Sequence, residues 1–556
     1  MNKTVNIEGI DKDIKAILMP YLAVNSETAT RGERNGEAFL LDYFNGIPYF
    51  QENKEYFGRH AIPDDALGRA VCWAVVKGRG DDTVILLHHY DVVGVEDFKT
   101  MHDLAFQPDL LKQELVQIAG ELQPEAREDL LSGEYLFGRG TADMKGGGAI
   151  QLALLKRYSE EADFKGNVIL ISLPDEENLS AGMRAAVDLL IELKNRFGLK
   201  YVYAFNSEPH QRKEKRKGLL SEGSVGKMLA FVYARGFLSH VGKVFEGFNP
   251  LSVLSEIVTR TEISPSFLDI VGGEAAPPPT WLYLRDNKEN YDVSMPLSAG
   301  GCISILTLDS NPTEILNVLK QISLDSFESV IRRIKESYSI FCNSSGRKLE
   351  PLPWNPSVIT FDELLKEAYQ SHGEIFTAAY QSKMHETGQK VKAGEINLME
   401  SSFLLVDFVY NYISDLSPRV VLGFVPPYYP NVSNLLLKDR SEREKNLSTE
   451  LSDYCNQKYG QEYEREYYYT GISDMSYFAL KDSGKIKEEL SHNMPLYGEI
   501  YSIPLEGIEE LSMPCMNIGP WGKDFHKLTE RVCKLDLYER TPDLLNRAVL
   551  IMLDQK

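Results

Sequence analysis

Apolar residues in the first 220 positions form two kinds of pattern, namely short unbroken runs and longer stretches with helical spacing. The short runs lie at 70–76, 83–88, 167–173 and 201–205. They are rich in β-branched residues and predict buried strands, because strands covered on both faces are apolar at nearly every position. Helical spacing indicates helices at 146–157 and 179–197. Strands that alternate with helices predict an α/β fold, in which a largely parallel twisted sheet carries helices on both faces.

The pattern changes after about residue 222. A strand-like run at 227–234 and a helical stretch at 250–261 precede strand-like runs at 281–285 and 302–308 and a helical stretch at 312–339. This order predicts a smaller α+β sandwich inserted into the α/β domain. We therefore expect the first part of a catalytic domain at 1–221, an inserted domain at 222–350 and the second part of the catalytic domain at 351–556. Within that second part, 416–423 indicates a strand and the charged stretch 436–469 indicates a helix and a loop.

Composition narrows the classes of partner. The formal net charge of −21 argues against nucleic acid, because binding to phosphates needs an excess of Lys and Arg. No apolar run approaches the roughly 18–20 residues of a membrane span, so we expect no membrane association. The six cysteines form no Cys-x-x-Cys pair, which favours a reducing compartment over a disulfide framework. We therefore expect a cytoplasmic protein.

Five fragments rich in His, Asp and Glu lie at expected strand ends or in Gly-rich turns. They are His89-Tyr90-Asp91, Gly138-Arg139-Gly140-Thr141-Ala142-Asp143-Met144-Lys145, Pro174-Asp175-Glu176-Glu177, Ser207-Glu208-Pro209 and Phe525-His526. Three of them follow expected strands, and open α/β sheets build their sites beyond the carboxyl ends of strands. Imidazole and carboxylate ligands without thiolates suit divalent ions such as Zn²⁺. Together the fragments supply the ligands of two neighbouring metals, a pair that makes a hydrolytic site.

Each fragment alone also has an ordinary explanation. An isolated His-x-Asp is usually a hydrogen-bonded surface pair, and two glutamates after a strand often begin a helix, where the dipole favours them. His526 alone is typical of a partly buried histidine. These explanations leave the order and spacing of the five fragments unexplained, so we favour the metal site.

The fragments resemble the signature of the dinuclear zinc amidohydrolase family that includes aminoacylase, acetylornithine deacetylase, succinyl-diaminopimelate desuccinylase and carboxypeptidase G. The stretch from Gly138 to Gly146 matches the family's Gly-Arg-Gly-x-x-Asp-Met-Lys-Gly without a break, and Gly519-Pro520 precedes His526. The resemblance extends over about residues 80–535 and implies a zinc exopeptidase-like fold. Overall length and Asp474-Met475-Ser476 are similar to the family's arginine-utilisation (RocB-type) subgroup.

The resemblance implies a role for each matched residue. Asp143 bridges both metals, while His89 and Glu208 complete one site, and Glu177 and His526 complete the other. Glu176 is the general base that deprotonates a metal-bridging water, Asp91 orients His89, and the Asp143–Met144 peptide is cis. The cofactor is a pair of divalent ions, for which Zn²⁺ is favoured and Co²⁺ and Mn²⁺ stay open.

The inserted domain contributes a second set of residues by the same resemblance. His240 donates to the oxyanion, in many members across a dimer interface, and Asn249 helps to hold the substrate carboxylate. A strand-end histidine on a polar face is the alternative for His240. We expect His88 to be a core or supporting residue, and His210 replaces the family's usual Thr. The arginine that binds the substrate carboxylate stays open between Arg235, Arg285 and Arg419.

These observations predict a metal-dependent amidohydrolase that cleaves an N-acyl amino acid or a short peptide, with a link to arginine catabolism implied by the subgroup. A dipeptidase or aminopeptidase with the same chemistry is the nearest alternative. A non-catalytic metal-binding regulator is another, although it would not need Glu176. A two-metal phosphoesterase is disfavoured because basic residues are lacking near the ligands. The assembly that the resemblance suggests is a homodimer.

Overall fold

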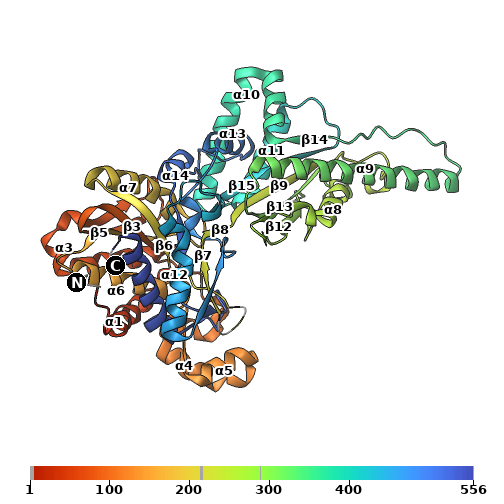
Figure 1. Ribbon diagram of the computed structural model, residues 1–556. Coiled ribbons are helices and arrows are strands. Elements are labelled where there is room, and N and C mark those ends of the chain that lie inside the picture. The colour runs from red at the N-terminus through yellow and green to blue at the C-terminus, as the bar shows by residue number, and fades with distance from the viewer. Residues whose placement is uncertain (1–4, 213, 215–216, 289, 555–556) are drawn as a thin grey trace. The chain divides into compact units, whose positions relative to one another are not determined.

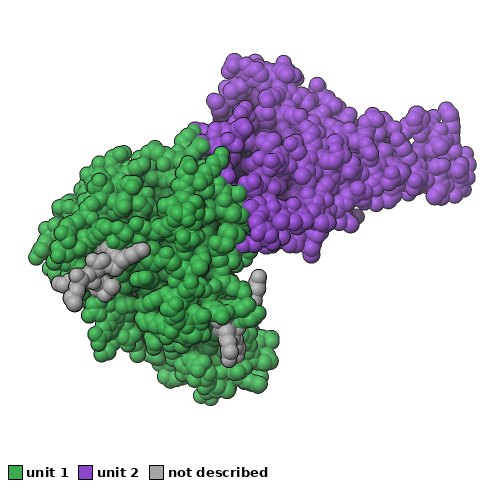
Figure 2. All heavy atoms as spheres, viewed as in Figure 1, with its two compact units in different colours: residues 1–224, 432–480, 506–556 green, residues 225–431, 481–505 purple. Residues whose placement is uncertain are grey.

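The chain forms two compact units, which Figure 2 shows in different colours. The structure is a computed structural model, and it describes residues 5–212, 214, 217–288 and 290–554. Unit 1 comprises Met1–Ser224, Val432–Leu480 and Glu506–Lys556, and unit 2 comprises Val225–Asn431 and Lys481–Leu505. The chain leaves unit 1 twice and returns twice, so unit 1 is assembled from three separate segments.

An eight-stranded sheet forms the centre of unit 1, with the strand order β1-β2-β5-β3-β6-β18-β7-β17. Its strands are β1 (Phe57–Ala61), β2 (Ala70–Lys77), β3 (Arg79–His89), β5 (Lys165–Leu173), β6 (Lys200–Asn206), β7 (Lys217–Ser221), β17 (Glu462–Glu466) and β18 (Cys515–Asn517). The neighbours β5, β3, β6 and β18 are parallel, whereas β2 pairs antiparallel with both β1 and β5. The carboxyl ends of β3, β5 and β6 therefore meet at one edge of the sheet.

Helices cover both faces of this sheet (Figure 1). On one face α6 (Lys145–Ser159) packs on β3 and β5, with α1 (Ile10–Ala23) and α15 (Thr541–Met552) against it. Val84 and Leu86 of β3 belong to the core on this side. The intervening Ile85 and Leu87 are equally buried but point to the opposite face, where α7 (Ala181–Phe197) contacts β2 and β5. Burial on both faces explains why these strands are apolar throughout. Unit 1 also contains α2 (Glu33–Asn45), α3 (Pro48–Glu52), α12 (Glu442–Tyr459) and nearly all of α14 (Leu505–Leu511).

A small three-stranded sheet lies beside the main one within unit 1, with the order β19-β20-β4. Its strands are β4 (Tyr135–Phe137), β19 (Gly522–Lys523) and β20 (Arg531–Cys533). The long connection before β4 forms α4 (Pro108–Gln117) and α5 (Pro124–Ser132), which share a core cluster with β4 and β20. Because His526 lies between β19 and β20, this small sheet anchors the loop that carries it.

Unit 2 contains a five-stranded sheet with the order β12-β13-β9-β15-β14. The strands are β9 (Gly226–Arg235), β12 (Thr280–Asp286), β13 (Ser298–Thr307), β14 (Val358–Thr360) and β15 (Arg419–Tyr429). The helices are α8 (Pro250–Thr261), α9 (Pro312–Ser345), α10 (Phe361–Lys392), α11 (Leu398–Val409) and α13 (Ser483–Asn493). Both α8 and α11 contact β9 and β13. The unit is an α+β sandwich, as the sequence predicts.

The division between the units differs from the boundary expected at residue 350. β15 pairs with β9 from Arg419 opposite Arg235 onward, and Phe361 and Phe403 join the core cluster of the five-stranded sheet. Sheet hydrogen bonds and shared core therefore place 351–431 in unit 2. The pattern change at 222 is visible in the sequence because strands replace helices there. No comparable change marks 350, since helices precede and follow it.

The other strands and helices expected from the sequence have counterparts in the structure whose ends differ by a few residues. The stretch 436–469 contains α12, but also β17, a parallel strand whose sequence Glu-Tyr-Glu-Arg-Glu is too charged to indicate a buried strand. All six cysteines are buried and free. None of the helices in the described ranges has the length and apolar character needed to cross a membrane.

Candidate metal centre

His89 ends β3, and its ring is held by the residue two positions further on. Nδ1 lies 3.0 Å from the backbone oxygen of Asp91 and 3.5 Å from its Oδ1. An Nδ1–H that donates to this carbonyl leaves the lone pair of Nε2 free to bind a metal. That nitrogen lies 3.1 Å from Oδ1 of Asp143 and 3.5 Å from Oε1 of Glu208.

The Asp91 carboxylate has a second contact that the sequence does not reveal. Its two oxygens accept hydrogen bonds from the backbone N–H groups of Glu176 and Glu177, each at 3.2 Å. One buried side chain therefore holds the turn after β5, while its own backbone oxygen orients His89.

Asp175, the residue before Glu176, also holds the turn after β5. It has a left-handed backbone conformation (φ 68°), and its carboxylate accepts hydrogen bonds from the backbone of Ala181 and from the Arg69 guanidinium. Arg69 also forms ion pairs with Glu33 and Asp65, both at 2.8 Å. Sequence reasoning missed Arg69 because it lies over one hundred residues from the turn and in no motif.

Asp143 lies in the Gly-rich turn before α6, and the Asp143–Met144 peptide is cis, as the family resemblance implies. Oε1 of Glu530 accepts hydrogen bonds from the backbone N–H groups of Ala142 and Asp143, each at 3.3 Å. The other oxygen of Glu530 pairs with Arg139 at 2.6 Å. Burial raises the pKa of Glu530 to about 7. The turn is thus supported by a buried ion pair between residues 391 positions apart.

Glu208 and His526 complete the cluster from distant parts of the chain. Glu208 follows β6, and a Cβ on Gly519 would lie 1.8 Å from its backbone oxygen, so only glycine fits at that position. His526 comes from the loop between β19 and β20, and its side chain is half exposed. Its Nε2 lies 3.2 Å from Oδ2 of Asp143 and 3.1 Å from Oε1 of Glu177.

These contacts divide the candidate ligands into two sets that share one residue. Oδ1 of Asp143 faces His89, which also contacts Glu208, whereas Oδ2 faces His526, which also contacts Glu177. Burial raises the pKa of both Glu208 and Glu176 well above the ordinary value. Carboxylates gathered around His89 and His526 need positive charge. By distance alone, the ligand atoms of His89, Asp143 and Glu177 and those of His89, Glu176 and Glu208 lie close enough to hold an ion, and donors of this kind fit divalent ions with oxygen and nitrogen ligands.

Two further residues of unit 1 belong to this centre and carry no assignment from the sequence. Asp474, the first residue of a short 3₁₀ helix (Asp474–Tyr477), is buried, and its charge acts on both Glu176 and Glu208. The charges of Glu208, Asp143 and Glu176 raise the pKa of Tyr469, after the larger effect of burial. The Asp474-Met475-Ser476 stretch was a signal, but only for the subgroup and not for a role in the site.

Two neighbouring histidines lie outside the ligand sets. His88 is a core residue, with Nδ1 3.1 Å from Oε1 of Gln151, and burial lowers its pKa to about 3. His210 is buried, and its Nδ1 lies 2.9 Å from the backbone oxygen of Gly519. Its Nε2 accepts a hydrogen bond from Arg212 at 3.2 Å. His210 therefore supports the Gly519 turn and does not face the metal ligands directly.

The sequence-predicted residues of unit 2 lie in its loops and helix ends. His240 is exposed, and its Nδ1 accepts a hydrogen bond from the backbone N–H of Gly242 at 3.0 Å. A neutral ring in that arrangement carries its proton on Nε2 and can donate it. Asn249 caps α8 through Oδ1, which accepts from the N–H of Leu251 at 3.0 Å.

The three arginines left open by the sequence are all paired with carboxylates in unit 2. Arg235 lies 3.6 Å from Asp407, Arg285 pairs with Glu400, and Arg419 pairs with both Glu367 and Asp415. These contacts single out none of them as the residue that binds the substrate carboxylate.

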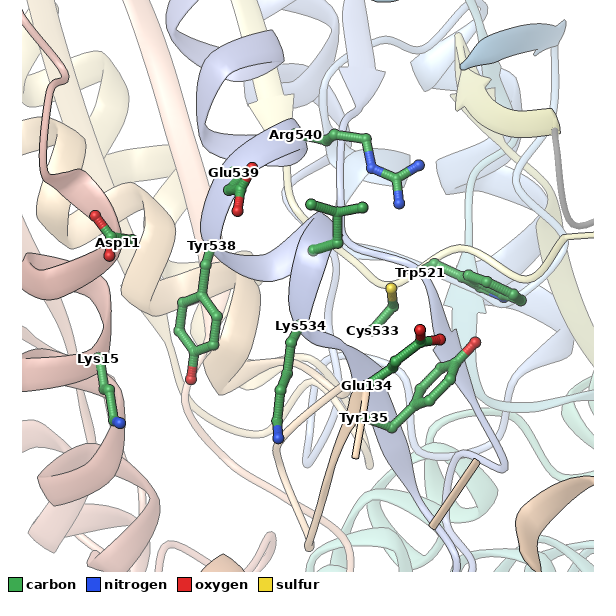
Figure 3. Close-up of a pocket in the computed structure, with 11 residues that line it drawn as sticks. Asp11, Lys15, Glu134, Tyr135, Trp521, Cys533, Lys534, Tyr538, Glu539 and Arg540 are labelled. Carbon is green, nitrogen blue, oxygen red and sulfur yellow. The ribbon is translucent and has the colours of Figure 1, made fainter. Parts of the chain in front are cut away.

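A separate cavity of about 530 Å³ lies in unit 1 (Figure 3). Lys15, Lys534 and Tyr538 line one part of it, and Glu134 and Trp521 line another. None of its lining residues is a sequence-predicted site residue, and cations and anions are mixed along its wall. It therefore adds nothing to the metal centre.

Comparisons with known proteins show the family to which the chain belongs. The sequence matches peptidase family M20/M25/M40 over residues 116–534. It is 31% identical to the Bacillus subtilis protein YqjN, over 98% of this chain and 97% of YqjN. It is 28% identical to the Bacillus subtilis protein RocB, over 97% of this chain and 95% of RocB. The structure of aminopeptidase PepT from Bacillus cereus superposes with a TM-score of 0.52 at 12% identity, covering 98% of this chain and 99% of PepT. The chain therefore belongs to peptidase family M20/M25/M40, and it is a metal-dependent hydrolase that acts on amide bonds.

Proposed function

We propose that this protein hydrolyses the amide bond of an N-acyl amino acid or a short peptide, with two divalent ions held by five side chains. The observation that carries the proposal is the division of the Asp143 oxygens between two ligand sets. His89, Asp143 and Glu208 would hold one ion, and Asp143, Glu177 and His526 the other. When bound, such ions lower the pKa of coordinated water toward about 7 and polarise a substrate carbonyl. Zn²⁺ is the favoured ion, with Co²⁺ and Mn²⁺ as alternatives.

Glu176 is the general base in this proposal. Its carboxylate lies 3.9 Å from Nε2 of His89, which is further than the other carboxylates of that set. It therefore lies beside the ligands and is available for proton transfer. Glu176 takes the proton of the attacking water and returns it to the leaving amine, a contribution typically worth about 10²–10⁴-fold in rate. Asp91, which holds the Glu176 backbone and the His89 ring, positions both.

Two residues of unit 2 have side-chain arrangements that suit the roles implied by the family resemblance. His240 is suited to donate from Nε2 to the oxyanion, because Nδ1 already accepts a hydrogen bond. Asn249 would bind the substrate carboxylate with its amide nitrogen, since its oxygen caps α8. A homodimer through the edge strand β12 is consistent with Leu282 and Leu284, whose side chains are about half exposed there.

Similarity to a relative and the state of the cysteines suggest the pathway and the compartment of the reaction. Similarity to RocB over almost the whole chain supports a place in amino-acid catabolism, with arginine utilisation as the specific suggestion. Free, buried cysteines support a reducing compartment such as the cytoplasm. A dipeptidase or aminopeptidase is the second candidate. It is favoured by the buried carboxylate of Asp474, which could bind the ammonium group of a peptide.

The test combines metal content with turnover. Purified protein loaded with Zn²⁺ is expected to hold about two ions per chain and to hydrolyse at least one member of a panel of N-acyl amino acids and dipeptides. Glu176→Gln should retain both ions and lose roughly 10²–10⁴-fold in kcat. Glu510→Gln, which changes an exposed glutamate, is the matched control. Two bound ions without Glu176-dependent turnover on any substrate would instead identify a non-catalytic metal-binding relative.

A further inference from the structure

The segment that carries Asp474 is attached to the strand end that carries Glu208. Ser473 accepts a hydrogen bond from Asn206, two residues before Glu208, at 2.8 Å. The hydroxyl of Tyr469 donates to the backbone oxygen of Pro209, one residue after it, at 3.2 Å. Two separate hydrogen bonds therefore fix 469–474 against the metal centre within unit 1.

The Asp474 carboxylate does not cap the helix that it begins. Only 2% of this residue is exposed. Ser473, and not Asp474, caps the short 3₁₀ helix, because its hydroxyl accepts from the N–H of Met475. Neither oxygen of Asp474 has a partner at hydrogen-bonding geometry among the described residues, although the Ser180 hydroxyl is close enough to lower its pKa.

The charges around Asp474 are mainly negative. His89 acts on it when protonated, but a metal-bound His89 would be neutral. The carboxylates of Asp91 and Asp175 also act on Asp474, and it in turn acts on Glu176 and Glu208. Two divalent ions would be offset by the three ligand carboxylates and one deprotonated water. Asp474 is additional to that balance, and no Lys or Arg within the described ranges forms an ion pair with it. A buried carboxylate without a cation is costly, and a ligand that brings a cation removes that cost.

We propose that Asp474 binds a positively charged nitrogen of the substrate next to the candidate metal centre. Asp474 is then a specificity-determining residue, and the substrate class narrows to amides that carry an ammonium or guanidinium group near the scissile bond. This inference rests on the proposed function. The α-ammonium of a peptide is one carbon away from the scissile carbonyl, so a free amino terminus satisfies the geometry directly. A cationic amino-acid side chain offers the same chemistry from further away.

Matched substrate pairs separate these sources of the cation. L-alanyl-L-leucine and N-propionyl-L-leucine share the scissile amide and differ only in the α-ammonium. Nα-acetyl-L-lysine and Nα-acetyl-L-norleucine differ only in the side-chain ammonium. The Zn²⁺-loaded wild type is expected to prefer the charged member of one pair, and the pair that shows the preference identifies the source.

Asp474→Asn keeps the shape of the side chain and removes its charge. We expect it to lower kcat/KM for the charged member of the preferred pair by about 10–100-fold, and to change the neutral member by less than about threefold. Asp474→Glu should restore part of the preference. Asp482→Asn, which changes an exposed aspartate eight positions further on, is the control and should behave as wild type. Equal losses on both members of each pair would show that Asp474 is only structural.

Binding gives a second readout that does not need turnover. In the Glu176→Gln background, calorimetry should show tighter binding of the charged member, and adding Asp474→Asn should abolish the difference. If the charged member binds better but Glu176-dependent turnover is absent, the proposed function fails and the role of Asp474 stands. If turnover depends on Glu176 but no charged member binds or reacts better, the role of Asp474 is overturned and the function stands.

Discussion

His89 in unit 1 and His240 in unit 2 show how differently the two sheets present a histidine. His89 is buried, and its Nδ1 lies 3.0 Å from a backbone oxygen, which leaves the Nε2 lone pair free for the metal proposed above. His240 is exposed, and its Nδ1 accepts from a backbone N–H, which leaves Nε2 as a donor. Opposite tautomers thus suit opposite tasks, and each is set by one backbone contact.

The regions around His89 and His240 also differ in the contacts that hold them in place. The edge of the eight-stranded sheet is held by buried groups such as Asp91, Arg69 and Glu530, each with more than one partner. The unit 2 loop that carries His240 is held by backbone contacts, including a bridge between His240 and Ser294, and the His240 ring itself accepts from the N–H of Gly242. Buried polar groups need partners, so they lock their surroundings, whereas exposed groups are hydrated and need no such framework. Substitutions in the two regions should therefore have different consequences for stability and for activity.

The largest effect is expected from His526→Ala, which removes a proposed metal ligand that is itself half exposed. One of the two ions should be lost, and kcat should fall by roughly 10³-fold or more, or about 4 kcal/mol of transition-state stabilisation. Elemental analysis and steady-state kinetics measure both quantities. His240→Ala should retain both ions, so equal metal loss in the two variants would break the comparison.

Arg69→Met tests the framework of unit 1. It leaves Glu33 and Asp175 buried without their cation, and the free energy of unfolding should fall by about 3–5 kcal/mol. Chemical denaturation of the metal-free protein measures the change. Arg79→Met, which removes an exposed pair with Asp163, is the control and should cost less than about 1 kcal/mol. Similar losses in both variants would mean that the buried cluster is not the framework.

The pH dependence of stability should reveal the buried histidine next to His89. Burial lowers the pKa of His88 from 6.5 to about 3, so between these values the unfolded chain binds a proton that the folded chain does not. The contribution of His88 is therefore complete above pH 6.5 and is lost as the pH falls, by up to about 1.4 kcal/mol per pH unit. Denaturation of metal-free wild type and His88→Gln from pH 7 to pH 4 should show a steeper loss of stability in the wild type. His210, whose pKa burial lowers to about 4, contributes the same slope to both proteins. His102→Gln, which changes an exposed histidine, should leave the slope unchanged.

The smallest effect concerns Asn249, where capping and substrate binding can be separated. Asn249→Ala removes the α8 cap and should lower the free energy of unfolding by about 1 kcal/mol, whereas Asn249→Asp keeps a capping oxygen. Both variants should weaken substrate binding, because neither has an amide nitrogen. If Asn249→Asp retained the wild-type KM, Asn249 would be a cap and nothing more.

The sequence predicted the candidate metal ligands, but it did not predict the residues that support them or the extent of unit 2. The ligands of the metal centre follow apolar strands or lie in Gly-rich turns, so their order in the chain predicts the edge at which they meet. Arg69, Glu530 and Asp474 support or extend that edge from distant positions without a local pattern, and only the folded chain shows their contacts. The extent of unit 2 was missed for a related reason, since β15 joins β9 across a long helical stretch.

The position of β18 has a consequence for the order in which this chain can fold during synthesis. β18 (Cys515–Asn517) lies between β6 and β7, whose residues are translated about three hundred positions earlier. An inner place in the sheet therefore stays open until nearly the whole chain has been made, and long-range pairing of this kind is slow to form. The contact between Gly519 and the backbone of Glu208 cannot form before the same step. A ribosome-bound chain that ends before residue 515 would accordingly have no working hydrolase, however well unit 2 had folded.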